Sequence, residues 1–234
     1  LCADIALATN ESVKRVAMSR GGMKDEDVYV VRTSPKIVAG DAVADAELRQ
    51  GRKYLVGYVG VMGNADGVDL VLEAIAHIVH ELKRSDIQFV LMGTGPEFEV
   101  LQRRRVDLKL EGIVEMPGRV SDEFLFSVLK TMDLGVSGDP RNGYNDHCTM
   151  NKVLEYMAFG KAQVMFDLAE GRASAGDASL YVGGNDPLLL GSAIVELLDD
   201  PTRRKRMGVC GRERLAEKLS WDRSVEQLLK SYRA

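Results

Sequence analysis

The start of a predicted helix near residue 150 has the residue types and spacing that favour anion binding. Thr149 is expected to cap this helix, and Lys152 lies in its first turn. A cation there opposes the positive end of the helix dipole, at a cost of roughly 0.3–1 kcal/mol. A diphosphate that accepts N–H bonds from Met150 and Asn151, with Lys152 as its counter-charge, would remove this conflict. The alternative is an exposed Lys152 that pairs with a nearby carboxylate.

Polar residues on both sides of this helix start have candidate roles of their own. Glu155 lies one turn after Lys152 on the same helical arc, where its carboxylate could accept hydrogen bonds from the vicinal hydroxyls of a ribose. Asp146 and His147 precede the helix and are candidate catalytic groups. In each case the alternative is a solvated surface side chain. Cys148 has no identifiable base nearby, so we do not expect it to act as a nucleophile.

Loops rich in glycine or small residues follow several of the predicted strands. Their backbone N–H groups can approach a phosphate closely, although the glycine spacing is not that of the dinucleotide-binding fingerprint. Loops at the carboxyl ends of parallel strands line one crevice, so we expect a single site. The candidate loop residues are Gly60, Gly63, Gly93, Gly95, Gly118, Arg119 and Val120. The later loop 167–177 adds Glu170 as a hydroxyl acceptor and Arg172 as a phosphate ligand.

Short β-branched segments alternate with long amphipathic segments along most of the chain. This alternation predicts an α/β protein with a doubly wound, Rossmann-like parallel sheet. The predicted strands span residues 5–9, 28–32, 54–59, 88–92, 113–116, 134–137, 163–166 and 180–182. The predicted helices span residues 11–19, 68–82, 96–108, 121–131, 149–159, 187–198 and 201–219.

The same pattern divides the chain into three segments. Residues 1–36 hold too few elements to bury a core, so we interpret them as the end of a domain that is mostly absent. Residues 37–53 lose the periodicity and are predicted to be a connector. Residues 54–234 contain enough strands and helices for one doubly wound domain of ordinary size.

The overall composition excludes several classes of protein. With 45% hydrophobic and 28% charged residues, the chain of 234 residues is typical of a globular protein, not of a disordered or fibrous one. Its formal net charge of −4 gives no field for binding nucleic acid, and no apolar run is long enough to cross a membrane. Three separated cysteines, Cys2, Cys148 and Cys210, indicate a reducing, cytoplasmic location. The histidines lack partners of metal-site type, so we expect no bound metal.

The order of the motifs resembles the donor-binding, carboxyl-terminal half of GT-B glycosyltransferases, most closely the family 4 group. The resemblance spans residues 54–233 and depends on the succession of motifs more than on any single one. These motifs are the Gly-rich turn 57–67, Met92-Gly-Thr-Gly-Pro-Glu97, Pro117-Gly-Arg-Val120, Glu155-Tyr-Met-Ala-Phe-Gly-Lys161, Asn185-Asp-Pro187 and Leu219-Ser-Trp-Asp-Arg223. By the same resemblance, residues 1–36 would be a remnant of the amino-terminal, acceptor-side half, and residues 54–234 the donor-binding domain.

The resemblance implies a retaining, metal-independent glycosyltransferase of hexosyltransferase type that needs no cofactor. Its donor would be a UDP- or GDP-sugar, and its acceptor a glycan or lipid-linked sugar in cell-surface polysaccharide biosynthesis. Acceptor binding and any peripheral association with a membrane would belong to the other half, so this fragment alone is expected to be inactive. A non-catalytic nucleotide-sugar-binding module is the alternative interpretation.

One departure from the family pattern concerns the two glutamates that mark its donor site. Glu155 matches the second glutamate, which by resemblance holds the ribose. The first glutamate would fall at His147, so we prefer the neighbouring Asp146 for the role of the sugar-facing carboxylate.

A second departure concerns the Arg and Lys that the family presents in its first Gly-rich loop. The corresponding positions here are Val61 and Asp66. The charge of a departing diphosphate must still be stabilised. We expect Lys152 and Arg172 to supply this positive charge.

Overall fold

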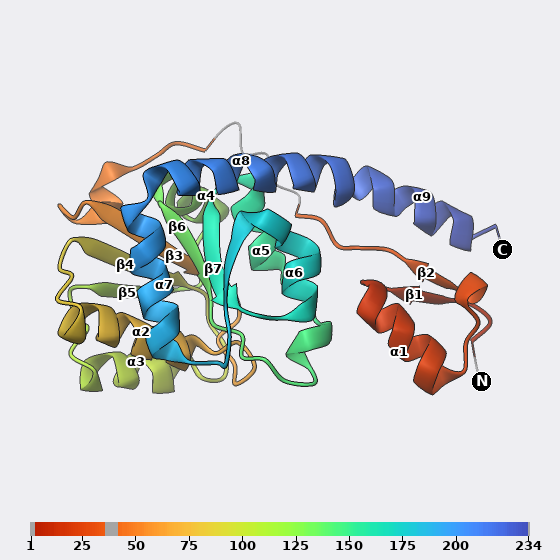
Figure 1. Ribbon diagram of the computed structural model, residues 1–234, viewed down its shortest axis with the longest axis horizontal. Helices are drawn as coiled ribbons and strands as arrows, with labels where there is room; N and C mark the ends of the chain where they lie inside the picture. Colours follow the sequence, from red (N-terminus) through yellow and green to blue (C-terminus); the bar gives the residue numbers. More distant parts are fainter. Residues whose placement is uncertain (1–2, 36–41, 234) are drawn as a thin grey trace.

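The predicted alternation of strands and helices is present in the computed structural model, which describes residues 3–35 and 42–233 (Figure 1). Six parallel strands form one sheet in the order β5-β4-β3-β6-β7-β8. They are β3 (Tyr54–Val59), β4 (Ile87–Met92), β5 (Val114–Gly118), β6 (Leu134–Ser137), β7 (Ala162–Phe166) and β8 (Ser179–Val182). The predicted doubly wound α/β fold is therefore confirmed.

The sheet is built outward from its central strand, β3. The chain first adds β4 and β5 on one side of β3 and then returns to add β6, β7 and β8 on the other side. Strands buried on both faces read as continuous apolar runs, and all six residues of β4 are buried. The direction in which strands are added reverses between β3 and β6, so the topological switch point lies at the carboxyl ends of these two strands. Sheets of this type bind ligands at that point.

Helices cover both faces of this sheet (Figure 1). One face packs against α2 (Val68–Ala76), α3 (Phe98–Asp107) and α7 (Pro187–Asp199). The other face packs against α4 (Asp122–Thr131) and α5 (Asn151–Ala158). Adjacent strand residues alternate between the two cores: Val56 belongs to the first and Leu55 to the second, and both are fully buried.

A small β-α-β unit lies beside the sheet and contains β1 (Ala6–Ala8), α1 (Glu11–Gly21) and β2 (Val28–Val30) (Figure 1). The side chain of Asn10 caps α1 by accepting a 2.8 Å hydrogen bond from the Val13 N–H. The long helix α8 (Pro201–Lys218) leads into α9 (Trp221–Ser231), which packs against β2. The Ser224 hydroxyl of α9 donates a 2.9 Å hydrogen bond to the carbonyl of Arg32.

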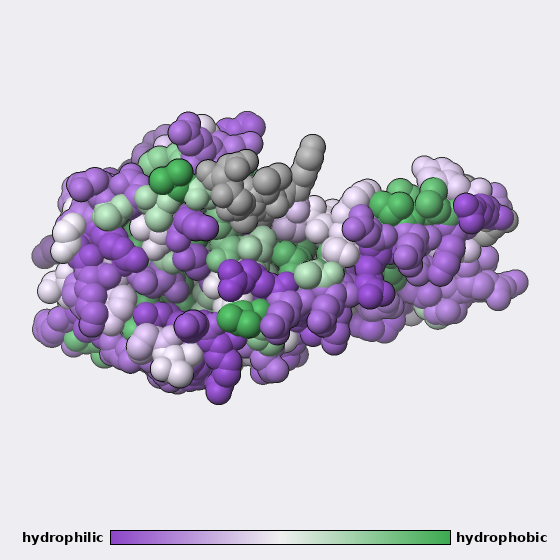
Figure 2. Space-filling model, turned by 90° about the horizontal axis from the view of Figure 1, so that it is seen from above, coloured by the Kyte–Doolittle hydropathy of each residue, from purple (hydrophilic) through white to green (hydrophobic). Residues whose placement is uncertain are grey.

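Two helices were absent from the sequence prediction. The predicted loop 167–177 contains α6 (Ala169–Ala175), because its small residues allow close packing: a Cβ on Gly171 would lie 2.9 Å from the Met165 sulfur. The second is α9, whose large exposed apolar side chains include Leu229, at 48%. Figure 2 shows apolar side chains gathered on the end of the molecule that α9 occupies.

The remaining differences concern the ends of elements and the predicted connector. The predicted helix 68–82 ends as α2 at Ala76 and continues as a π-helical turn, His77–Glu81. Within the predicted connector 37–53, Ala46–Arg49 forms a short 3-10 helix, and residues 36–41 lie outside the described residues. None of the helices in the described chain is long and apolar enough to span a membrane.

Candidate functional site

A cleft of about 510 Å³ lies at the carboxyl ends of β3 and β6. Three segments line it: the Gly-rich loop after β3, the loop after β6, and the first turns of α5. This is the switch point of the sheet, where the sequence predicted that the loops would meet. The cleft contains six of the predicted site residues, namely Gly60, Thr149, Met150, Asn151, Lys152 and Glu155.

Glycines allow the loops around the cleft to touch backbone to backbone. A Cβ on Gly93 would lie 1.8 Å from the carbonyl oxygen of Gly60, and a Cβ on Gly67 would lie 1.9 Å from that of Gly138. Gly95 packs in the same way against the backbone of Met62. No side chain larger than hydrogen fits at these positions without moving a backbone. Gly93 and Gly95, predicted to line the site, instead lie outside the cleft wall and support the loop after β3.

The first turn of α5 has no side-chain cap. The sequence predicted Thr149 as the cap, but the N-cap residue is Met150, and the helix begins at Asn151. Thr149 does not cap the helix; its hydroxyl instead accepts a 2.9 Å hydrogen bond from the side-chain amide of Asn10, in the small β-α-β unit. Helix starts carry N–H groups without intrahelical partners and bind anions. The start of α5 therefore presents such groups toward the cleft.

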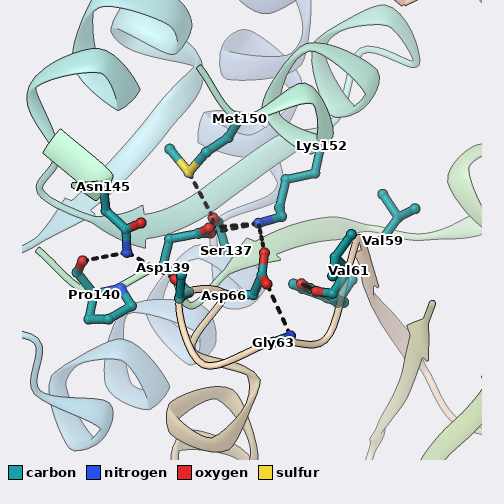
Figure 3. A network of polar contacts seen from close by, with 12 residues as sticks. Val59, Val61, Gly63, Asp66, Ser137, Asp139, Pro140, Asn145, Met150 and Lys152 are labelled. Atoms are coloured by element: carbon teal, nitrogen blue, oxygen red, sulfur yellow. Dashed lines mark hydrogen bonds and ion pairs between the residues drawn. The ribbon is translucent and has the colours of Figure 1, made fainter. Parts of the chain in front are cut away.

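Lys152 is buried in the wall of the cleft beside two carboxylates (Figure 3). Its ammonium group donates hydrogen bonds to both side-chain oxygens of Asp139, at 2.9 and 2.7 Å, and lies 4.0 Å from Asp66 Oδ1. The Ser137 hydroxyl donates a further hydrogen bond to Asp139. The side chain of Lys152 passes close to Gly60, where a Cβ would lie 3.1 Å from Lys152 Cε. Lys152 thus has a carboxylate partner, as the alternative interpretation expected, but it is 7% exposed instead of solvated.

Asp66 belongs to the Gly-rich loop and is less firmly held than Asp139. Its Oδ2 accepts a 3.0 Å hydrogen bond from the N–H of Gly63, which closes a local turn. Burial raises the pKa of Asp66 above its usual value, and the positive charge of Lys152 partly opposes this shift. Asp66 therefore gains a proton more readily than an exposed aspartate does.

The carboxylate of Glu155 lies in the cleft half-buried, and no hydrogen-bond donor reaches it from the part of the chain that the structure describes. Burial raises the pKa of Glu155, while the charge of Lys152 lowers it by a smaller amount. A partly desolvated acceptor without a partner is costly unless a ligand supplies donors. Glu155 is therefore available to accept hydrogen bonds from hydroxyl groups.

Other predicted site residues lie outside the cleft. His147 is exposed, and its carbonyl accepts a 2.8 Å hydrogen bond from the Asn10 amide. Asp146 accepts hydrogen bonds from Arg141 Nε, at 3.2 Å, and from the Ala169 N–H, at 3.1 Å. Both residues directly precede the cleft-lining Cys148 and Thr149, so they lie near its rim and not inside it.

The residues predicted around later loops have structural partners instead. Arg172 is exposed and pairs with Asp167, so it does not face the cleft as expected. Glu170 is 2% exposed and accepts a 3.2 Å hydrogen bond from the N–H of Ser12. Gly63, Gly118, Arg119 and Val120 also lie outside the cleft wall.

Two residues that the sequence analysis missed organise the site. Asp139 holds Lys152, and the buried side-chain amide of Asn145 joins two loops by donating to the carbonyls of Ala65, at 2.9 Å, and Pro140, at 2.8 Å. The only signal in the sequence is that Asp139 lies two residues after a buried strand, where a turn former is also common. In residues 3–35 and 42–233, no three acidic, histidine or cysteine side chains are grouped so that they could hold a metal ion.

Comparison with known sequences identifies a protein family and individual relatives. The family model of glycosyl transferases group 1 matches residues 53–200. A glycosyltransferase of Methanocaldococcus jannaschii is 21% identical over 98% of this chain and 58% of its own length. A GDP-mannose-dependent phosphatidylinositol monomannoside mannosyltransferase of Corynebacterium glutamicum is 28% identical over 69% of this chain and 42% of its own length.

Solved structures give the same result for the fold. The crystal structure of the S. aureus protein TarM, in complex with fondaparinux, α-GlcNAc-glycerol and UDP, superposes with a TM-score of 0.81. That protein is 18% identical, and the match covers 99% of this chain and 44% of TarM. The chain thus spans roughly half the length of the relatives and structures that it matches.

Proposed function

This chain belongs to the family of glycosyl transferases group 1, and on that premise we propose that its cleft binds the nucleoside diphosphate of a UDP- or GDP-sugar. The observation that carries the proposal is the composition of one cleft wall. A helix start without a side-chain cap, a buried Lys152 and a Glu155 carboxylate that accepts no hydrogen bond within the described chain lie together at the switch point of the sheet. These groups match a diphosphate, its negative charge and a ribose diol.

Each part of the donor has a proposed contact. The diphosphate accepts N–H bonds at the start of α5, from Met150 and Asn151, and lies beside Lys152. Glu155 accepts hydrogen bonds from the ribose. The base lies toward the loops after β4 and β5, which contain Gly93, Gly95, Gly118, Arg119 and Val120. Asp146 and His147, near the rim, are the proposed groups that face the sugar.

The proposed reaction is metal-independent transfer of a hexose with retention of configuration, to a glycan or lipid-linked acceptor. Lys152 is the residue in the cleft that can stabilise charge on the departing diphosphate, a contribution that commonly lowers barriers by several kcal/mol. Arg172 is not assigned this role because its side chain pairs with Asp167. Support for the two donor classes comes from the GDP-mannose dependence of the corynebacterial relative and the UDP bound to TarM.

The acceptor is proposed to bind to parts of the full protein outside this chain. The relatives are longer than the region that matches this chain, which supports this assignment. We therefore expect this chain to bind nucleotide but to transfer little or no sugar. A cytoplasmic location, a place in cell-surface polysaccharide synthesis and peripheral contact with a membrane are further parts of the proposal.

Calorimetric titration tests the donor site directly. We expect UDP or GDP to bind, and the corresponding nucleoside to bind more weakly because it lacks the phosphates that α5 and Lys152 contact. ADP serves as a control for recognition of the base. If neither UDP nor GDP binds at millimolar concentration, the proposed function of this cleft is wrong.

A non-catalytic nucleotide-sugar-binding module is the second candidate, and the first Gly-rich loop favours it. By the resemblance to the family, its basic pair would fall at Val61, which is 60% exposed, and at the acidic Asp66. The two candidates differ in turnover by the longer protein. Donor hydrolysis or transfer to any acceptor by that protein would exclude the module, whereas nucleotide binding without either would favour it.

A further inference from the structure

We infer that Asp66 competes with the diphosphate of the donor for the ammonium group of Lys152. The inference rests on the proposed function of the cleft and adds a residue that tunes donor affinity. It assigns different roles to the two carboxylates around Lys152: Asp139 positions the ammonium group, and Asp66 opposes the ligand.

The geometry around Lys152 leaves at least one of its three N–H groups for a ligand. Two hydrogen bonds go to the two oxygens of Asp139, at 2.9 and 2.7 Å. Asp66 Oδ1 lies at 4.0 Å, which is an ion-pair distance but too long for a hydrogen bond (Figure 3). Asp66 is therefore attracted to Lys152 without occupying its remaining N–H. A phosphate oxygen that takes this N–H comes close to the Asp66 carboxylate.

The charge balance of the cleft makes this proximity unfavourable. Among the described residues, three carboxylates, Asp66, Asp139 and Glu155, line the cleft with a single ammonium group, that of Lys152. The other lining side chains are uncharged or weakly acidic, with no second Lys or Arg among them. A diphosphate brings further negative charge into a site that is already net negative. Binding is therefore expected to be weaker than the helix start and Lys152 alone would allow.

The side chain of Asp66 can move more easily than that of Asp139. The Asp139 side chain is 8% exposed and is fixed by Lys152 and by the Ser137 hydroxyl. The Asp66 side chain is 23% exposed, and its one hydrogen bond within the described chain is to the N–H of Gly63. A donor can displace this carboxylate by rotating it toward solvent, or it can bind while Asp66 is protonated.

The substitution Asp66→Asn removes the charge and keeps the turn, because the amide oxygen can still accept the Gly63 N–H. We expect the Kd for UDP or GDP to fall roughly three- to tenfold, while the Kd of the nucleoside is unchanged. Asp69→Asn is the matched control, since Asp69 is exposed on the first turn of α2, outside the cleft, and carries the same charge. This control should leave both affinities unchanged.

Calorimetry on the wild type and the variants distinguishes the outcomes, with thermal melts to show that each protein is folded. Asp66→Ser provides a second test, because its hydroxyl can also close the turn. If the wild type binds UDP or GDP and neither variant binds it more tightly, the inference is wrong and the proposed function stands. An equal gain for the nucleoside also overturns the inference. If neither wild type nor variants bind any nucleotide, the inference and the proposed function fail together.

Discussion

Glu155→Ala is the substitution that best separates ligand binding from folding in this protein. The Glu155 carboxylate is half-buried and accepts no hydrogen bond within the described chain, so its removal breaks no hydrogen bond there. It also removes a partly desolvated charge, whose burial raises the pKa of the carboxyl group. We therefore expect the free energy of unfolding to stay the same or to increase.

The same substitution is expected to weaken nucleotide binding. If Glu155 accepts hydrogen bonds from the ribose diol, its loss costs about 1–3 kcal/mol, as for other hydrogen bonds to a charged partner. This corresponds to a rise in Kd of roughly 5- to 150-fold. A side chain that stabilises the fold would instead lower stability and affinity together.

The assay is a cycle of two proteins and two ligands, measured by calorimetry. Wild type and Glu155→Ala are each titrated with the ribonucleoside diphosphate and with its 2′-deoxy analogue. The wild type should prefer the ribonucleotide, and the variant should bind the two ligands equally. If the wild type does not distinguish them, or if the variant keeps the full preference, Glu155 does not hold the ribose.

Three further predictions test the packing around the site and the core. Lys152→Met should lower the free energy of unfolding by about 3–5 kcal/mol in urea titrations, because it leaves Asp139 buried without its cation; a change below about 1 kcal/mol would contradict this account. Burial lowers the pKa of Lys161 from 10.5 to about 8. The charged form of Lys161 therefore destabilises the folded protein at pH 7, and the stability of the folded protein increases as the pH rises from about 8 toward 10.5. Lys161→Met should accordingly raise Tm at pH 7 and have little effect near pH 10; an equal gain at both would refute the pKa shift. Gly93→Ala should destabilise by about 2–5 kcal/mol, because its Cβ would lie 1.8 Å from the Gly60 carbonyl, and an unchanged Tm would show that the loops separate easily.

The strands of this protein are well predicted from sequence because each is a short apolar run bounded by turn residues. The residues predicted for β3, 54–59, are those found in the structure, and β6 also agrees with its predicted range, 134–137. The helix α6 escaped prediction because Ala, Gly and Ser have no clear periodicity, although their small size is what lets α6 pack on β7. Its formation depends on a tertiary contact that no local pattern contains.

Part of the candidate site could also be predicted from the sequence, and part of it could not. The sequence analysis left a bound diphosphate and a nearby carboxylate as alternative partners of Lys152, and the structure shows that a carboxylate group pairs with it. The sequence could not show that Asp139 is that group, because the two residues meet only when the loop after β6 folds back on the helix start. The error at Thr149 has the same origin, since its hydroxyl contacts Asn10, which is 139 positions away in the sequence.

The packing of α9 against β2 limits how shortened versions of this protein can be produced. The last helix directly follows α8, which packs on the large sheet, yet its Ser224 hydroxyl donates a hydrogen bond to the backbone carbonyl of Arg32, beside the small unit. A shortened protein that ends before Trp221 would lack α9, so β2 and the β-α-β unit to which it belongs would lose their packing against this helix. For soluble expression, the amino-terminal β-α-β unit and α9 should therefore be kept together or removed together.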